Sequence, residues 1–416
     1  METLFAIFLS LIVIIIVKLL NDRRGKKYVL PPGPFGLPLV GNALQFGNIP
    51  PHIKHMEWSK KYGDIHTVNL FGQTSVVLSS LDAVKECNFD HSDDFNHRPI
   101  WLECLCNIAP GIAFRGADQY KENRRFVLRN LKDHGMGKSE LEPKILNEID
   151  YALSILDQAE DRTIEPHDLM ETFSANVISQ LCFSKSWGHH GTDSKRLKQY
   201  LKATNEMTEA VTMLDFLPIL KNLPSMKKTY SEFMYNVNCI QNIGKACVTE
   251  RQKIVGEDGE NNCMVYESMD LVDDFLIASK NNPTVEEVKN FMQISHDLFE
   301  AGTHTSATTI TFAMIQLINK QDLQEQLYEE IVNYFGERRS PSMSDMKSMP
   351  LMEAFIQETF RVYAIVPLIF HATFIDSKLR DYTIPKNTSV LINAHCINHD
   401  EKVRLFLAII FCHIFT

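Results

Sequence analysis

The sequence predicts a mainly helical protein that carries a small β-sheet. Helical periodicity dominates residues 118–360, where only short polar stretches interrupt it. β-Branched residues on either side of Phe71 and Gly72 predict a hairpin over residues 65–79. Strand character returns late in the chain, in residues 372–374, 379–383 and 389–392. The sheet is therefore expected to combine strands from both ends of the chain.

One long helix dominates the helical region. Thr284 and Glu287 form a capping-box pattern after Pro283, and the helical pattern continues to about Ile318, which corresponds to roughly 50 Å. The middle of this helix, residues 299–306, is unusual because Gly302 alone weakens a helix by ~1 kcal/mol. Two interpretations stay open for this stretch. It packs closely against a neighbouring helix, or it opens locally and admits a ligand beside the backbone.

Composition and charge exclude some classes of protein. The 416 residues are 44% hydrophobic, which is enough to bury a large core, and the net charge of −10 argues against a nucleic-acid partner. The nine cysteines form an odd set without pairing rhythm, as expected for reduced thiols in the cytosol. Cys104 and Cys106 are separated by one residue, which is not a usual zinc spacing.

The start of the chain predicts a membrane anchor. Residues 4–17 are uncharged and almost wholly apolar, and a snorkelling Lys18 extends the stretch to Leu20, which gives roughly 25 Å of helix. Glu2 precedes this stretch and four basic residues follow it within residues 23–27, so the body is expected in the cytosol. A cleaved signal peptide is the alternative, but it needs a basic start and small residues at its end.

Six segments in a fixed order carry a family resemblance. They are Pro31-Pro32-Gly33-Pro34 with Gly41-Asn42, Phe95-Asn96-His97-Arg98-Pro99, Arg124-Arg125-Phe126 with Gly135-Met136-Gly137-Lys138, Ala301-Gly302-Thr303-His304-Thr305, Glu358-Thr359-Phe360-Arg361 with Pro367, and Tyr382-Thr383-Ile384-Pro385-Lys386. Each segment is weak alone, but together they resemble animal microsomal cytochromes P-450, the family-2-like haem-thiolate monooxygenases. The resemblance covers residues 1–400 and implies a triangular helical domain, mainly α with a small β-sheet.

The resemblance divides the chain into four segments. Residues 1–27 are the membrane anchor with its basic stop, and residues 28–44 are a linker that its prolines make stiff. Residues 45–402 are the catalytic domain of this family, which is expected to be incomplete. Residues 403–416 are a divergent apolar tail, too short to cross a bilayer and rich in aggregation-prone residues.

The resemblance also implies a haem cofactor and the residues that hold it. Haem propionates are anions in an apolar cleft and need paired cations, and Arg98, Arg124 and His371 match the family positions that supply them. Arg124 and Arg125 point about 100° apart on a helix, so only one of them can face a pocket. Without the resemblance, either arginine is more simply a solvated helix residue. The family usually has tryptophan where this chain has Tyr120.

Two adjacent residues of the long helix are the predicted catalytic pair. Thr305 matches the family hydroxyl that hydrogen-bonds dioxygen and helps deliver protons, and His304 stands where the family usually has an acidic residue. A histidine can relay protons near neutral pH. The resemblance places Ala301, Ile365 and Val366 in the substrate pocket. These apolar residues are consistent with a lipophilic substrate.

Glu358 and Arg361 are three residues apart on one helix face. Such a pair is often a weak surface contact. The resemblance implies a buried structural pair instead, which a later arginine completes in the family.

The iron of this family is held by a cysteine thiolate in a Phe-x-x-Gly-x-Arg-x-Cys-x-Gly stretch. None of the nine cysteines has those neighbours. Cys396 follows a predicted strand, and Cys412 stands among apolar residues, where a thiol ionises poorly. No metal ligand is therefore assigned, and the chain is expected to be C-terminally truncated near Lys402.

Three functional hypotheses follow. The first is a monooxygenase at the endoplasmic-reticulum membrane, which inserts one atom of O₂ into a lipophilic small molecule with electrons from NADPH-cytochrome reductase. The second is a haem-free, non-catalytic fragment or splice product. The third, an acyl-transfer hydrolase, lacks a Gly-x-Ser-x-Gly elbow.

Overall fold

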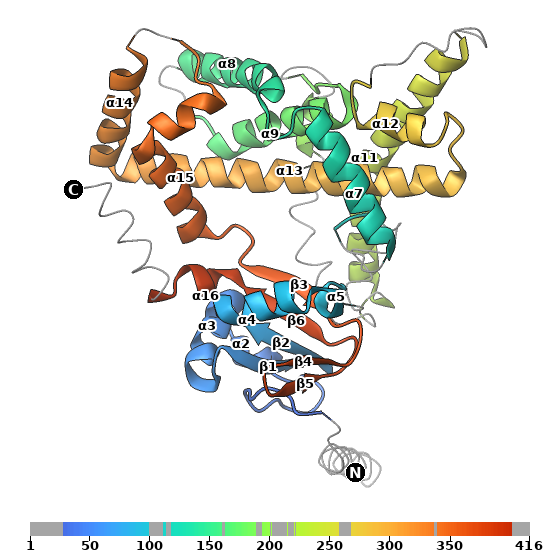
Figure 1. Ribbon diagram of the computed structural model, residues 1–416, viewed down its shortest axis with the longest axis vertical. Helices are drawn as coiled ribbons and strands as arrows, with labels where there is room; N and C mark the ends of the chain where they lie inside the picture. Colours follow the sequence, from blue (N-terminus) through green and yellow to red (C-terminus); the bar gives the residue numbers. More distant parts are fainter. Residues whose placement is uncertain are drawn as a thin grey trace. The chain divides into compact units, whose positions relative to one another are not determined.

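The computed structural model describes residues 28–99, 111–113, 118–159, 163–188, 194–199, 201, 214, 220, 222–257, 268–336 and 339–401 (Figure 1). The predicted anchor of residues 1–27, the segment of residues 100–110 and the apolar tail of residues 403–416 lie outside these residues. The chain divides into two units. The sheet unit comprises Met1–Ile100 and Pro367–Asp400, and the helical unit comprises Trp101–Val366 and Glu401–Thr416. Across the described residues, every helix is too short or too polar to cross a bilayer.

The sheet unit contains a four-stranded sheet in the order β1-β2-β6-β3. Strands β1 (Ile65–Leu70) and β2 (Gln73–Leu78) form the predicted antiparallel hairpin. Strand β6 (Ser389–Asn393) pairs in parallel with β2, and β3 (Leu368–Ala372) pairs with β6 in the antiparallel sense. The prediction that the sheet combines both ends of the chain is confirmed.

Two details of the late strands differ from the prediction. Residues 379–383 are not one strand, because β4 (Ser377–Leu379) and β5 (Tyr382–Ile384) form a separate hairpin that turns at Arg380 with a φ of 50°. Strand β3 lies earlier than predicted and ends at Ala372. The next residue, Thr373, donates its hydroxyl to the Pro385 carbonyl at 2.6 Å.

Side chains from both faces of the sheet form the core of this unit. Trp58, on helix α3 (Pro51–Tyr62), packs with Val68, Val77 and Leu391. A second cluster packs Ile65, Val76, Leu78, Val390 and Ile392 with Phe95, Leu379 and Ile384. Every residue of β6 is buried, as expected for a central strand covered on both faces. The remaining short helices of the unit are α2 (Ala43–Phe46), α4 (Leu81–Lys85), η1 (Glu86–Asp90), α5 (Ser92–Phe95) and α16 (Ala394–Asn398).

The helical unit is built around α13 (Val285–Asn319), which runs the length of the unit in Figure 1. It packs against α9 (Pro166–Phe183), α11 (Pro224–Glu257), α14 (Gln321–Phe335) and α15 (Pro350–Tyr363). The other elements are α7 (Asp118–Asp133), η3 (Ser139–Leu141), α8 (Glu142–Ala159), α12 (Leu271–Ala278) and η5 (Met343–Ser348).

The long helix begins where the sequence predicts. The Thr284 backbone N–H donates to Glu287 Oε2 at 2.7 Å, and the Glu287 N–H donates to Thr284 Oγ1 at 3.2 Å, which completes the capping box. The helix is continuous through residues 299–306. A Cβ added at Gly302 would lie 3.0 Å from Ile178 Cγ1 on α9, so this glycine permits close helix packing. The structure thus supports the packing interpretation of this stretch rather than a local opening.

A buried ion-pair cluster fixes α11 to the start of α12. Arg251 donates through Nη2 to Asp270 Oδ2 at 2.9 Å and through Nη1 to Asp273 Oδ1 at 2.7 Å. Asp270 is fully buried and also caps α12, because its Oδ1 accepts the backbone N–H groups of Val272 and Asp273. Arg251 therefore neutralises a carboxylate that water does not reach.

A second buried carboxylate fixes the segment of residues 111–113 to α13. Asp297 Oδ2 accepts the backbone N–H groups of Ile112 at 2.7 Å and Ala113 at 2.9 Å. Its Oδ1 accepts from Gln293 Nε2 at 2.7 Å. These hydrogen bonds satisfy a charge that would otherwise be costly to bury.

Candidate functional site

The predicted catalytic threonine lies in the middle of α13, where its hydroxyl contacts its own helix. Thr305 Oγ1 donates to the Ala301 carbonyl at 2.6 Å, and Thr309 Oγ1 donates in the same way to the Thr305 carbonyl at 2.7 Å. Ala301 is exposed in the helical unit. A threonine hydroxyl in this geometry can still accept a hydrogen bond, but it must leave the carbonyl before it can donate one elsewhere.

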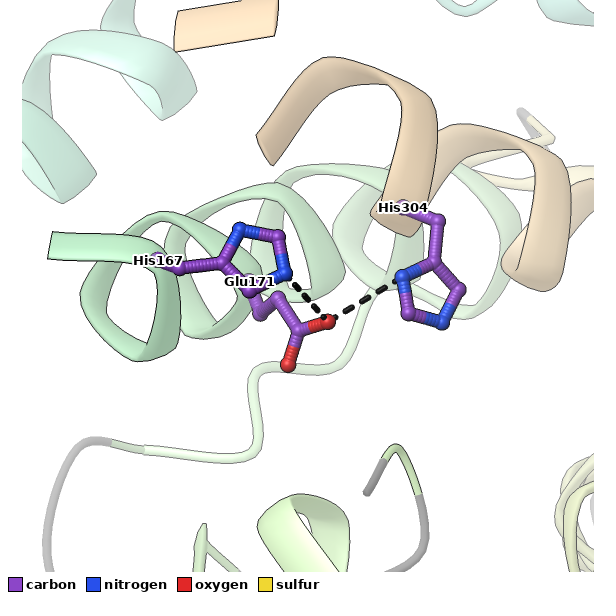
Figure 2. A group of neighbouring side chains, drawn as sticks. All are labelled: His167, Glu171 and His304. Atoms are coloured by element: carbon purple, nitrogen blue, oxygen red, sulfur yellow. Dashed lines mark ion pairs between the residues drawn. The ribbon is translucent and has the colours of Figure 1, made fainter. Parts of the chain in front are cut away.

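His304, the residue before Thr305, contacts α9 (Figure 2). Its Nδ1 lies 3.0 Å from Glu171 Oε1, and His167 Nε2 lies 3.2 Å from the same oxygen. His167 and Glu171 are one turn apart on α9, so one carboxylate oxygen stands between two imidazoles from two helices. Successive residues of a helix point about 100° apart, so the His304 and Thr305 side chains leave α13 in different directions.

The pairing of the Glu171 carboxylate with histidine side chains offsets the cost of burying this cluster. Glu171 is only 9% exposed in its side chain, against 22% for His304 and 34% for His167. Burial alone lowers the pKa of His304, but the hydrogen bond to Glu171 and the nearby Glu300 carboxylate together raise it above the ordinary value. Burial raises the pKa of Glu300, which lies one turn earlier on α13. The pairing of His304 with Glu171 therefore favours the imidazolium form.

His167 and Glu171 were not among the residues predicted from the sequence. Their spacing of four residues is a signal that the sequence contains, because it puts both side chains on one helix face. Their partner His304 stands more than a hundred residues later, and nothing local in the sequence indicates that α9 packs on this part of α13. The cluster is therefore a product of tertiary packing.

Two of the three predicted propionate ligands lie together in the sheet unit. Residues Asn96 and His97 bridge to Ala372 at the end of β3, which brings Arg98 near His371. The Nδ1 of His371 lies 3.0 Å from the Phe95 carbonyl. Burial, and then the charge of Arg98, lower the pKa of His371, which favours the neutral ring. A bound carboxylate would favour the protonated ring, whose Nε2–H could then donate to it.

The third predicted propionate ligand, Arg124, belongs to the helical unit. It lies on α7, where Arg124 and Arg125 are both exposed while Asn123 and Val127 are buried. Arg98 and His371 thus stand in one unit and Arg124 in the other, so the set of three stays a prediction.

The predicted structural pair forms a two-pronged ion pair on α15. Arg361 donates through Nε to Glu358 Oε2 at 2.7 Å and through Nη2 to Glu358 Oε1 at 2.6 Å. The Glu358 side chain is 48% exposed and that of Arg361 is 15% exposed, so water reaches the carboxylate. Near the end of the same helix, the predicted pocket residues Ile365 and Val366 are half-buried and exposed, respectively.

A cysteine can hold the iron only as a thiolate, so the pKa of each thiol decides its fitness as a ligand. Burial raises the pKa of Cys87 and of Cys182 to about 12. Burial also raises the pKa of Cys247 and of Cys396. Cys239, the fifth cysteine in the described part of the chain, packs against an apolar cluster of α9 and α11. The residues beside β3 thus fit a haem propionate, whereas the cysteines of the described ranges do not fit the iron.

Comparisons with known proteins identify the family to which the sequence is similar. A family model described as Cytochrome P450 matches residues 31–403. Cytochrome P450 2C38 of Mus musculus is 29% identical over 96% of this chain and 81% of its own length. Cytochrome P450 2C5 of Oryctolagus cuniculus is 31% identical over 92% of this chain and 77% of its own length. Cytochrome P450 1A1 of Canis lupus familiaris is 30% identical over 97% of this chain and 78% of its own length. Fold, motif order and these similarities together show that the chain belongs to the cytochrome P450 family.

Proposed function

We propose that this protein serves as a monooxygenase that inserts one atom of O₂ into a lipophilic small molecule, with electrons from NADPH-cytochrome reductase. Membership of the cytochrome P450 family makes it an oxidoreductase whose cofactor is haem. The observation that carries the proposal is the placement of Arg98 beside His371 in the sheet unit, where both can hold a carboxylate. The apolar character of Ala301, Ile365 and Val366 supports a lipophilic substrate.

Each residue has a proposed task. Arg98 and His371 pair with haem propionates, and Arg124 is proposed as a third partner. When bound, haem supplies the centre at which dioxygen is reduced. Thr305 Oγ1 passes a proton once it leaves the Ala301 carbonyl, and His304 holds a proton at Nδ1 against Glu171. Glu358 and Arg361 hold the end of α15.

A second candidate function is a haem-free, non-catalytic form of the 416-residue polypeptide. The observation that favours it is the state of the cysteines, because none of the nine has the family's ligand neighbours and burial raises the pKa of four of the five described thiols. Haem content of the purified polypeptide distinguishes the two candidates.

The proposed role of Thr305 predicts a change in coupling. In a variant that carries a family-type cysteine segment after Glu401, Thr305→Ala should raise the peroxide released per NADPH consumed severalfold, because a positioned proton donor is lost. Thr309→Ala is the matched control, since Thr309 makes the same contact with its own helix one turn later. Equal peroxide yields from both substitutions would contradict the role of Thr305, and Thr305→Ser should restore coupling.

We further propose that residues 4–20 anchor the protein in the endoplasmic-reticulum membrane with its body in the cytosol. The apolar stretch and the basic residues that follow it support this proposal. The intact protein should resist carbonate extraction from microsomes, and deletion of residues 1–27 should release most of it from the tightly bound fraction. If the protein is instead recovered in the lumen with residues 1–20 removed, those residues are a cleaved signal peptide.

A further inference from the structure

The donor atoms of His167, Glu171 and His304 converge within 4.8 Å of one another between α9 and α13 (Figure 2). We propose that these three side chains bind one transition-metal ion of the zinc class, with a fourth position open to water. The site lies wholly in the helical unit. Because His304 Nδ1 is also the atom that holds a proton in the proposed function, the ion and that proton compete for one nitrogen.

The distances fit such an ion. A tetrahedral zinc ion has nitrogen and carboxylate ligands at about 2.0–2.2 Å, so two ligand atoms are roughly 3.3 Å apart. The Glu171 oxygen lies 3.2 Å from His167 Nε2 and 3.0 Å from His304 Nδ1. These two distances match a tetrahedral ion, and the two imidazole nitrogens, which lie within 4.8 Å of each other, can both approach it. Two imidazoles and one carboxylate with a free fourth position are a ligand set that zinc uses in proteins.

The ligand atoms, two imidazole nitrogens and one carboxylate oxygen, indicate which class of ion the site would bind. Imidazole nitrogens suit zinc, copper, nickel and cobalt, whereas magnesium and calcium prefer a shell made of oxygens. The side chain of His167 is 34% exposed, which leaves a path for the ion and for a bound water. Glu171 supplies one negative charge in the most buried position of the three, where a dication is the natural partner.

The hydrogen bonds around His167 orient it as a metal ligand. Thr311 Oγ1 donates to the Ala307 carbonyl at 2.8 Å, so towards His167 Nδ1, at 3.4 Å, this hydroxyl can only accept. Nδ1 must then carry the proton in that contact. In the neutral ring Nε2 is then left with a lone pair that faces the Glu171 carboxylate. A proton on Nε2 or a metal ion between the two groups makes this arrangement favourable.

The second imidazole ligand, His304, has a carboxylate, Glu300, one turn earlier on the same helix. A metal on His304 Nδ1 places the ring proton on Nε2, which is buried and has no hydrogen-bond partner among the described residues. Glu300 is one turn earlier on the same helix, and its buried Oε1 has no partner among them either. A metal-bound histidine commonly donates its other ring N–H to a carboxylate, a backbone carbonyl or a water. Neither His304 Nε2 nor Glu300 Oε1 is hydrogen-bonded in the described part of the chain, so both stay available for such a partner.

The test measures binding of zinc alone to the purified 416-residue protein. After metal is removed with a chelator, competition against a chromogenic chelator should show one tight equivalent per chain. Glu171→Gln and His304→Gln should each weaken that binding by about 10- to 100-fold or more, because a ligand matters at least as much as its outer shell. Two matched controls should bind as the unmodified protein does. His134→Gln removes a histidine that pairs with Asp274 at 2.6 Å outside any three-ligand group of the described residues, and His395→Gln disrupts the histidine contacts of the sheet unit.

A spectroscopic test works even if a substitution disturbs folding. Cobalt in the unmodified protein should give the intense visible bands of a four-coordinate site, and His304→Cys should add a sulfur-to-metal charge-transfer band. Circular dichroism without metal checks that each variant is folded. The proposal is overturned if the Glu171→Gln, His304→Gln double variant binds zinc as tightly as the unmodified protein, if His395→Gln abolishes binding, or if cobalt shows only the weak bands of a six-coordinate ion.

Discussion

The 416-residue polypeptide, reduced and exposed to carbon monoxide, is expected to give no Soret band of the thiolate-ligated type. That band requires a cysteine thiolate on the haem iron, and none of the nine cysteines has the neighbours of the family's ligand. Burial raises the pKa of Cys87, Cys182, Cys247 and Cys396, so these thiols remain protonated near neutral pH. Arg98 and His371 still allow loose haem association, which should be substoichiometric.

The control for this result is a gain of signal. A family-type cysteine segment appended after Glu401 should restore the band, and replacement of the cysteine in that segment by serine should abolish it again. The measurement is the reduced carbon-monoxide difference spectrum together with haem per chain. A full-strength band from the unmodified polypeptide would contradict the expectation and make Cys396 and Cys412 the first residues to substitute.

Arg251→Met is expected to lower the free energy of unfolding of the helical unit by about 3–5 kcal/mol. The substitution keeps the apolar stem but leaves the fully buried Asp270 and the nearly buried Asp273 without their cation, which is the costly way to break a buried pair. Chemical denaturation followed by circular dichroism measures the loss. Asp270→Asn in the Arg251→Met background should recover part of it, because the amide can still cap α12 without a charge.

The adjacent residue offers a matched control. Glu250 pairs with Lys185 at 2.7 Å, but the side chains of both are at least half exposed. Lys185→Met should therefore cost less than about 1 kcal/mol. Losses of similar size for Lys185→Met and Arg251→Met would show that burial does not decide the strength of these two pairs.

The parts of the fold that depend on local signals could be predicted from the sequence. The β1–β2 hairpin follows from β-branched residues around Phe71 and Gly72, and the start of α13 follows from Thr284 and Glu287, which both occur within a few residues of each other. The late strands were less predictable. Residues 379–383 have strand-like composition, but the turn at Arg380 divides them, and a non-glycine residue with positive φ carries little sequence signal.

The candidate site was predictable only where family motifs mark it. Arg98 and His371 were found by resemblance, and the structure brings them near each other because the Asn96–His97 segment bridges to β3. The partners of His304 were not found, because the contact between α9 and α13 depends on the whole packing of the helical unit. Gly302 shows what the sequence could not decide, because its neighbours in the sequence fitted close helix packing and local opening equally. Only the position of Ile178 on α9 distinguishes the two interpretations.

Because β2 pairs in parallel with β6, the hairpin is synthesised long before the strand that completes its edge. Val77 pairs with Leu391, so the hairpin leaves the ribosome roughly three hundred residues before its neighbour exists. At about 5–20 residues per second, that interval lasts roughly 15–60 seconds. Throughout it, the edge of β2 offers unpaired backbone groups that other chains can bind. We therefore expect this edge to need protection, for example by a chaperone, until β6 has been made.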